Sequence, residues 1–451
     1  GQVEAVASTG GGPATGTPVV YGGVVNVQFS VFDSNSNKVV IAYRDLTNST
    51  HGYAVVGTVS GTAISFGTPV VFLASNPANI TATFDSSANK VVISYAAVSN
   101  NFYGTSIVGT VSGTSISFGT AVVFRSVFAV TTPECSAFDS NSNKVVIAYR
   151  VLSTSGEAIV GTVSGTSISF GSPVVFHSGD VSNQATTFDS NSNTIVIGYR
   201  NASGGAGTAV VGTVSGTSIS FGSAVVFDTD DLGQPLAIAF DSNSNKVIFM
   251  YSDFGNSYAG TAVVGTVSGT SISFGSKSVF VSNTGSATLS IAAAFDTNIN
   301  KVLITYIDYT NSGYSTAVLA TVSGTSISFG TPLVYSQSTV TYNTVVFDSV
   351  ANKLVISYEK SGGTSSVYTD DGSNSTSFIG IASEAISNTA TGAINVYGGI
   401  AASASATLPA VLSAGTAAVF EAATTNYISS AFDSNSNKVV ISYRDGGDAD
   451  K

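Results

Sequence analysis

The chain has 451 residues and a formal net charge of −11 at pH 7. This acidic balance excludes partners held through a phosphate backbone, such as nucleic acids, because such binding depends on Lys and Arg. Hydrophobic residues make up 43% of the sequence and charged residues only 9%, so we expect neighbouring subunits or glycan to cover much of the surface.

Three further features limit the class of protein. No apolar run reaches the roughly 18 residues that a transmembrane helix needs, so no membrane insertion is expected. The one cysteine, Cys135, excludes an internal disulfide and is expected to be a small buried hydrophobe. Because residue 1 is Gly and the only Met is Met250, we expect a removed leader or a fragment, which favours an extracellular or virion-surface location.

The chain is organised around residues 32–43, which read FDSNSNKVVIAY. In each copy of this segment a Tyr follows eleven residues after the first Phe. The copies begin at Phe32, Phe84, Phe138, Phe188, Phe240, Phe295, Phe347 and Phe432. Such self-similarity at a fixed period predicts a repeat architecture.

The first unit contains four predicted strands. Residues 27–32 and 38–43 are alternating or β-branched and flank a polar turn, which predicts the first two strands. Residues 54–59 are the third strand, and residues 63–66 with 69–72 are the outermost one. Four antiparallel strands in roughly fifty residues are typical of a β-propeller blade.

The sequence therefore predicts an all-β fold, a single eight-bladed β-propeller over residues 1–451, with four-stranded antiparallel blades. Six regular blades are expected at 24–72, 77–124, 131–176, 181–227, 234–280 and 287–335. A seventh, irregular blade is expected at 340–420, with an insertion near 400–414 that is either a docking arm or a loose loop.

The eighth blade is expected to be shared by the two termini. Residues 16–21 nearly copy residues 67–72, so residues 1–23 would supply the third and fourth strands. Residues 426–447 would supply the first two, and the ring would close without an exposed edge.

Two repeated features invite a ligand interpretation, and a structural one is favoured for each. The segment from Asp33 to Asn37 resembles the start of a calcium loop, but only its first Asp and last Asn persist in all copies, as in Asp348 and Asn352. These positions suit an Asx turn, so no metal site is predicted. The Tyr that ends each copy is predicted to pack between blades.

Variation between the units is confined to one face. The turn after the first strand and the turn after the third strand are nearly constant and lie on the same face, whereas the loops of the opposite face differ in every unit. This pattern fits either a recognition surface or drift in unconstrained loops.

Aromatic residues on the variable face that could stack on sugar rings are Tyr53, Phe102, Tyr103, Phe254, Tyr258, Tyr309 and Tyr314. Candidate glycosylation sites are Asn48, Asn79, Asn201 and Asn374.

No motif indicates catalysis or a cofactor. The two histidines, His51 and His177, have no ligand partner at motif spacing, and no nucleophile elbow or phosphate-binding glycine loop is present. A pair of carboxylates across the ring, as a glycosidase needs, stays open as an alternative.

The repeat, FDSxxNKVVIxY followed by VGTVSGTSISFG, resembles tandem repeats in structural proteins of phages and environmental bacteria. Residues 378–387 and 391–399 also resemble a segment common in phage tail-fibre-like proteins. The resemblance implies a virion-surface or extracellular role and no catalytic residue. We therefore expect a non-enzymatic structural or adhesive propeller that self-associates in a fibre or another multi-copy assembly. The alternatives are a carbohydrate-binding, lectin-like propeller and a glycan-cleaving enzyme.

Overall fold

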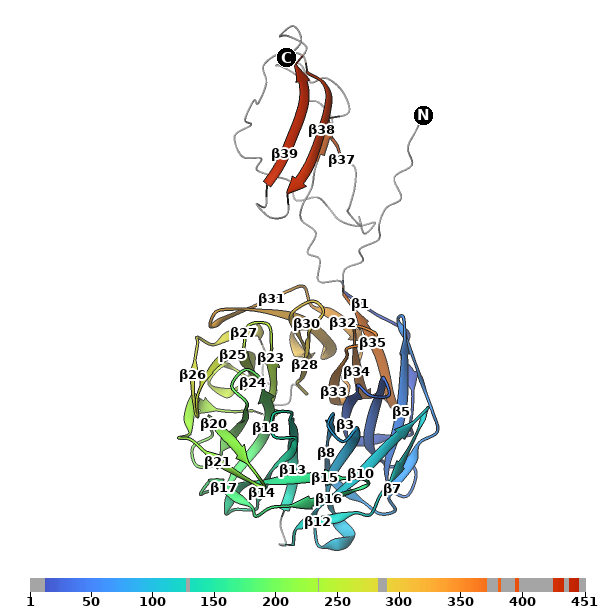
Figure 1. Cartoon of the computed structure of the whole chain (residues 1–451), viewed down its shortest axis with the longest axis vertical. Helices are drawn as coiled ribbons and strands as arrows, with labels where there is room; N and C mark the ends of the chain where they lie inside the picture. Colours follow the sequence, from blue (N-terminus) through green and yellow to red (C-terminus); the bar gives the residue numbers. More distant parts are fainter. Residues whose placement is uncertain are drawn as a thin grey trace. The chain divides into compact units, whose positions relative to one another are not determined.

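The computed structural model describes residues 13–126, 130–233, 235–282, 290–370, 380–382, 394–396, 425–433 and 438–445. Contacts within the chain divide it into two units, Gly1–Gly399 and Ile400–Lys451. In the described part of the first unit, seven antiparallel sheets surround a central axis as the blades of a β-propeller (Figure 1). None of the helices in the described residues has the length and apolar character that a bilayer crossing needs.

Each blade has four strand positions, numbered here from the axis outward. The first strands are β3 (Val25–Asp33), β8 (Pro77–Asp85), β13 (Val130–Asp139), β18 (Val181–Asp189), β23 (Ala237–Asp241), β28 (Ala292–Asp296) and β33 (Thr341–Asp348). The second strands are β4 (Lys38–Asp45), β9 (Lys90–Ala97), β14 (Lys144–Val151), β19 (Thr194–Asn201), β24 (Lys246–Asp253), β29 (Lys301–Asp308) and β34 (Lys353–Glu359). The third strands are β5 (Gly52–Ser60), β10 (Tyr103–Ser112), β15 (Ser155–Ser164), β20 (Ala206–Ser215), β25 (Ala259–Ser268), β30 (Tyr314–Ser323) and β35 (Gly363–Thr369).

The outer strand of each blade is split into two short segments that pair with the same third strand. In blades 1 to 6 these are β6 (Ala63–Phe66) with β7 (Val70–Leu73), β11 (Ser115–Phe118) with β12 (Val122–Arg125), β16 (Ser167–Phe170) with β17 (Val174–His177), β21 (Ser218–Phe221) with β22 (Val225–Asp231), β26 (Ser271–Phe274) with β27 (Ser278–Val281), and β31 (Ser326–Phe329) with β32 (Leu333–Ser336). In blade 7 they are β1 (Ala14–Thr15) with β2 (Val19–Val20).

Shorter elements complete the described chain. Three 3-10 helices follow second strands, η1 (Val98–Asn100), η2 (Phe254–Asn256) and η3 (Tyr309–Asn311). Strands β36 (Gly380–Ala382) and β37 (Ile394–Val396) form one two-stranded sheet, and β38 (Thr425–Asp433) and β39 (Lys438–Asp445) form another.

The prediction of eight blades, the last shared between the two termini, was wrong. The N-terminal strands β1 and β2 pair with β35 and complete the seventh blade, so the ring closes there. Gly16 N donates to Val367 O and Tyr21 N donates to Gly363 O, both at 2.8 Å. The seventh sheet has three strands of its own and lacks only an outer one, which a single extended segment can supply. The expected insertion at 400–414 lies outside the described residues.

The turn between the first two strands of each blade is an Asx turn, as predicted. In blade 1, Asp33 Oδ1 accepts the backbone N–H groups of Asn35 (2.9 Å) and Ser36 (3.0 Å). The closing residue Asn37 has φ of 58°, and the equivalent Asn of the other six blades lies in the same left-handed region. The turn Asp of each blade is almost completely buried, because these hydrogen bonds satisfy its carboxylate inside the protein.

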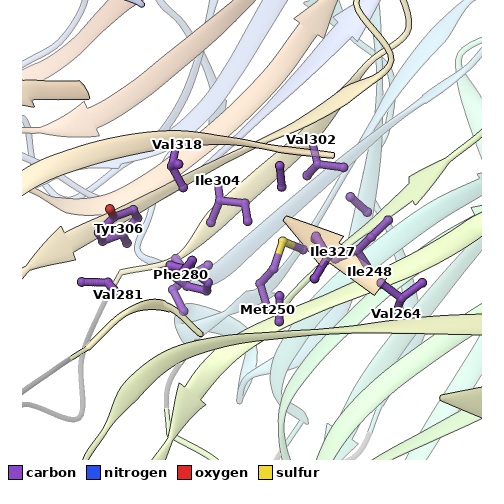
Figure 2. Packing of buried hydrophobic residues seen from close by; sticks show 14 residues of the cluster. Ile248, Met250, Val264, Phe280, Val281, Val302, Ile304, Tyr306, Val318 and Ile327 are labelled. Atoms are coloured by element: carbon purple, nitrogen blue, oxygen red, sulfur yellow. The ribbon is translucent and has the colours of Figure 1, made fainter. Parts of the chain in front are cut away.

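Neighbouring blades pack through the repeated Tyr, which confirms its predicted role. Phe72 of blade 1 lies 5.3 Å, centroid to centroid, from Tyr95 of blade 2, and the same pair recurs at every blade junction. At the closure the pair is Tyr21 with Tyr43, also at 5.3 Å. Figure 2 shows one junction, where Met250 and Phe280 of blade 5 face Ile304 and Tyr306 of blade 6. Second strands are apolar on both faces because a blade covers each face.

Candidate functional site

The first strands carry a ring of unusual backbone conformations where they leave the variable face. Five residues, each five positions before the repeated Phe, have positive φ: Val27 (49°), Asn79 (44°), Asn183 (51°), Ser290 (48°) and Tyr342 (53°). In blades 1, 2, 4 and 7 the pairing with the second strand shifts register at this point, which marks a β-bulge. A left-handed conformation costs a β-branched or aromatic residue about 1–2 kcal/mol, so the fold enforces it here.

The residue after the bulge connects neighbouring first strands. Gln28 Nε2 donates to Tyr342 O at 2.7 Å, and Asn343 Nδ2 donates to Ser290 O at 3.0 Å. Tyr21 of the closing strand donates its hydroxyl to Gln28 Oε1. Burial raises the pKa of Tyr21 well above its usual value, so this hydroxyl stays a donor. These two amide bridges tie together the part of the channel rim that blades 6, 7 and 1 form.

A cavity of about 640 Å³ lies inside this rim. Its lining comes from first strands, from the end of β29, from η3 and from loops of the variable face. It consists of Val27, Gln28, Phe29, Asn79, Ile80, Pro235, Ser290, Ile291, Ile307, Tyr309, Thr339, Thr341, Tyr342 and Asn343. None of these lining residues is charged. A smaller cavity of about 170 Å³ shares Phe29, Ile291 and Asn343 with it and is also lined by Cys135, which is buried as predicted.

Two side chains in the lining offer contacts to a ligand. Tyr342 is 44% exposed, which is unusual for an aromatic residue on an inner strand. Asn343 Oδ1 is buried and has no hydrogen-bond partner in the described residues, although the amide nitrogen of the same side chain is bonded. A buried acceptor without a partner is costly, so it is a natural place for a ligand hydroxyl.

The aromatic residues that the sequence predicted as sugar-stacking candidates do not form one group in the structure. Only Tyr309, in η3, lines the cavity. Tyr53 is buried and stacks on Tyr43, with ring centroids 5.9 Å apart. Phe254 and Tyr258 pack edge to face at 4.7 Å on blade 5. The remaining candidates, Phe102, Tyr103 and Tyr314, are half-buried outside the cavity lining.

Sequence reasoning missed Tyr342 and Asn343 because it searched the loops rather than the inner strands. Their place five and four residues before Phe347 is the same as that of Val27 and Gln28 before Phe32. A comparison of the residues five and four positions before the repeated Phe would have shown that they differ between units, although the segment that follows them is nearly constant.

The candidate glycosylation sites have different surroundings, and their use stays a prediction. Asn48 is exposed, but its Nδ2 donates to Tyr53 Oη at 2.6 Å. Asn201 Oδ1 accepts a backbone N–H two residues later at 3.0 Å. Asn79 lines the cavity, and Asn374 lies outside the described residues.

A second cluster, on blades 4 and 5, joins three carboxylates and a lysine. Lys277 Nζ lies 2.9 Å from Asp253 Oδ2, 3.0 Å from Asp228 Oδ2 and 3.5 Å from Asp230 Oδ2. Burial lowers the pKa of Lys277, but the hydrogen bonds to Asp253 and Asp228 outweigh it, so the pKa is raised. Tyr251 also donates to Asp228, at 2.7 Å. The Lys277 ammonium occupies the position between the carboxylates that a metal ion would otherwise take. The cluster therefore forms an ion-pair network that links blade 4 to blade 5.

No protein-family model matches the chain, and no curated protein matches it. A chain of a structure titled "Crystal Structure of Mitotic Checkpoint Complex" is similar, with a TM-score of 0.50 and 10% identity, over 78% of this chain and 94% of that one. A protein of unknown function from Dyadobacter fermentans is also similar (TM-score 0.48, 11% identity, 80% of this chain and 99% of that one). So is a triple arginine-to-alanine mutant of AofleA from Arthrobotrys oligospora (TM-score 0.46, 10% identity, 73% and 94%). At such identities the likeness concerns the fold alone, which is that of a β-propeller built from tandem repeats.

Proposed function

We propose that the protein is a non-enzymatic adhesive propeller that binds a neutral carbohydrate in the cavity at the mouth of its central channel. The observation that carries the proposal is the described part of the cavity lining, whose residues offer amides, hydroxyls and tyrosines and include no charged side chain. A volume of about 640 Å³ is within the range of roughly 300–1,000 Å³ typical of small-ligand sites.

The chemistry of the lining suits a sugar. Tyr342 and Tyr309 offer flat aromatic faces and hydroxyl groups, and Asn343 Oδ1 is a buried acceptor for one ligand hydroxyl. An anionic or cationic ligand would lose its hydration without meeting an opposite charge, which disfavours both. A neutral ligand with several hydroxyl groups satisfies the acceptor at no such cost.

The same lining supports binding rather than cleavage. Glycoside hydrolysis uses two carboxylates, one as the acid and one as the base or nucleophile. The described lining of the cavity contains no carboxylate, which favours binding over cleavage.

An exterior, multi-copy setting is part of the proposal. Only 9% of the residues are charged, and the outer strands expose one valine each at the rim of six blades. These are Val20, Val71, Val123, Val175, Val226 and Val279. A surface with so little charge favours contacts with further copies. A virion surface and a cellular appendage both fit, in keeping with the resemblance to phage and bacterial structural proteins.

A glycan array that contains neutral and anionic glycans tests the site. We expect binding of neutral glycans only, and at least tenfold weaker binding by Tyr342→Ala. Tyr258→Ala is the matched control, because Tyr258 also has positive φ (62°) and lies on the variable face but not in the cavity lining. Loss of binding by Tyr258→Ala alone would move the site to blade 5. Turnover of any bound glycan would refute the non-enzymatic role.

A further inference from the structure

The two cavities of the central channel lie one behind the other. Each first strand runs from the variable face to the Asx turn on the opposite face. Along these strands the larger cavity is lined by residues six to three positions before the repeated Phe, and the smaller one by residues four to two positions before it. Because a strand rises about 3.3 Å per residue, the smaller cavity lies roughly one or two residues deeper in the channel. We call the two the mouth cavity and the deep cavity.

The two cavities together are lined by all seven blades. Blades 1, 2, 5, 6 and 7 contribute to the mouth cavity, and blades 1, 3, 4, 5, 6 and 7 contribute to the deep cavity. Phe29, Ile291 and Asn343 belong to both linings and mark the passage between them. The deep cavity is thus surrounded by first strands, and the mouth cavity lies between it and the variable face.

The deep cavity has the size and the chemistry for one sugar ring. Its volume is about 170 Å³, and a cavity of roughly 150 Å³ can hold one benzene molecule. Its described lining offers the hydroxyl groups of Ser136, Thr186 and Thr344 beside aliphatic side chains such as Val345. Such a mixture suits the hydroxyl groups and the C–H faces of a pyranose ring. At the passage, Asn343 Oδ1 is buried without a partner among the described residues, so a unit that enters the deep cavity can donate to it.

We propose that the deep cavity is the subsite for the terminal sugar, so that the protein binds the free non-reducing end of a neutral glycan. This inference rests on the proposed function and names the part of the glycan that the site recognises. An internal unit could reach the deep cavity only if the chain folded back and two segments passed the mouth together, whereas the deep cavity holds one ring. A glycan that is attached through its reducing end has only its non-reducing end free to enter.

An array of neutral oligosaccharides attached through their reducing ends tests the proposal. Each oligosaccharide is present in two forms, one with its own free end and one with a further neutral sugar of another kind added to that end. We expect the first form to bind about tenfold more tightly than the second. Equal binding of both forms, together with weaker binding by Tyr342→Ala, would overturn this inference and leave carbohydrate binding intact. Binding of no neutral glycan at all would refute the proposed function and the inference with it.

Two variants that fill the deep cavity test its role directly. Ala293 and Ala237 are half-buried and line the deep cavity but not the mouth cavity. Leucine at either position adds three carbon atoms to a small space, so Ala293→Leu and Ala237→Leu should each weaken binding of the free-end form by about tenfold.

Ala294→Leu is the matched control for these variants. Ala294 is the next residue of β28, is also half-buried and lines neither cavity, so this variant should bind as the wild type does. Thermal unfolding shows whether each variant is folded, and two filling variants on different blades keep the test independent of one of them. Undiminished binding by folded Ala293→Leu or Ala237→Leu would overturn the proposal.

Discussion

The glycine that follows the outer-strand Phe sets the distance between blades. In blade 2 this residue is Gly119, and a Cβ added there would lie 1.8 Å from Thr166 O of blade 3. The same clash, at 1.7–2.0 Å, exists at Gly16, Gly67, Gly171, Gly222 and Gly275. The obstacle is a backbone carbonyl rather than a movable side chain. Gly119→Ala must therefore push blades 2 and 3 apart by about 1 Å or more in a close-packed interface.

The cost of this displacement follows from what lies at the same junction. Phe124 packs on Tyr149 at 5.5 Å and on Phe170 at 5.4 Å, and both contacts would loosen. Overpacking a core costs about 1–3 kcal/mol, and a backbone clash belongs at the upper end. For a ring of this size that unfolds as one unit, about 3 kcal/mol lowers the Tm by about 4 °C.

Differential scanning calorimetry of Gly119→Ala and Gly330→Ala measures the effect. Gly330 has the same place in blade 6, but among the described residues a Cβ there would meet only Leu319 O at 3.5 Å. We expect a decrease in Tm for Gly119→Ala and almost none for Gly330→Ala. Equal Tm values for Gly119→Ala and wild type would refute the claim that this glycine is required for blade contact.

Three further perturbations test other parts of the ring. Val27→Asn should raise the free energy of unfolding in urea by about 1 kcal/mol, since two blades already carry Asn at this left-handed position; a decrease would mean that packing of Val27 outweighs strain. Burial raises the pKa of Tyr95 to about 12, so the unfolded chain loses this proton first, from pH ~10 upward. The contribution of Tyr95 to the free energy of unfolding should therefore be constant below pH ~10 and decrease toward pH 12; the reverse slope in this range would contradict the shift. Lys277→Met leaves Asp228 and Asp253 buried without their partner and should cost about 2 kcal/mol at pH 7, less at pH 4; an equal cost at both pH values would exclude an ionic cause.

Much of the ring could be predicted from local sequence. The turn from Asp33 to Asn37 is specified by its own residues, because Asp accepts nearby N–H groups and Asn tolerates positive φ. Residues 16–21 were predicted to supply an outer strand because they copy residues 67–72, and they do. These features depend on short-range chemistry that each repeat carries within itself.

The blade number and the binding cavity could not be predicted in this way. The N-terminal strand fits any sheet that lacks an outer strand, and only tertiary pairing with β35 decides which one it completes. The bulges are set by contacts between neighbouring first strands, and the bulge residues include Val27, Asn79 and Tyr342, which share no propensity. The repeat pattern predicts the residues that all blades share, whereas the cavity is lined by residues that differ from blade to blade.

The outer strand of the seventh blade comes from the N-terminal segment, so the ring can close only after β35 has been synthesised. Thr369 bonds to Ala14 across 355 residues of sequence. At a synthesis rate of about 5–20 residues per second, the first strand waits roughly 20–70 s before its sheet exists. Throughout that interval the nascent chain exposes an apolar strand that matches the outer edge of every blade. Closure of the ring therefore depends on a contact between two segments that are synthesised far apart in time.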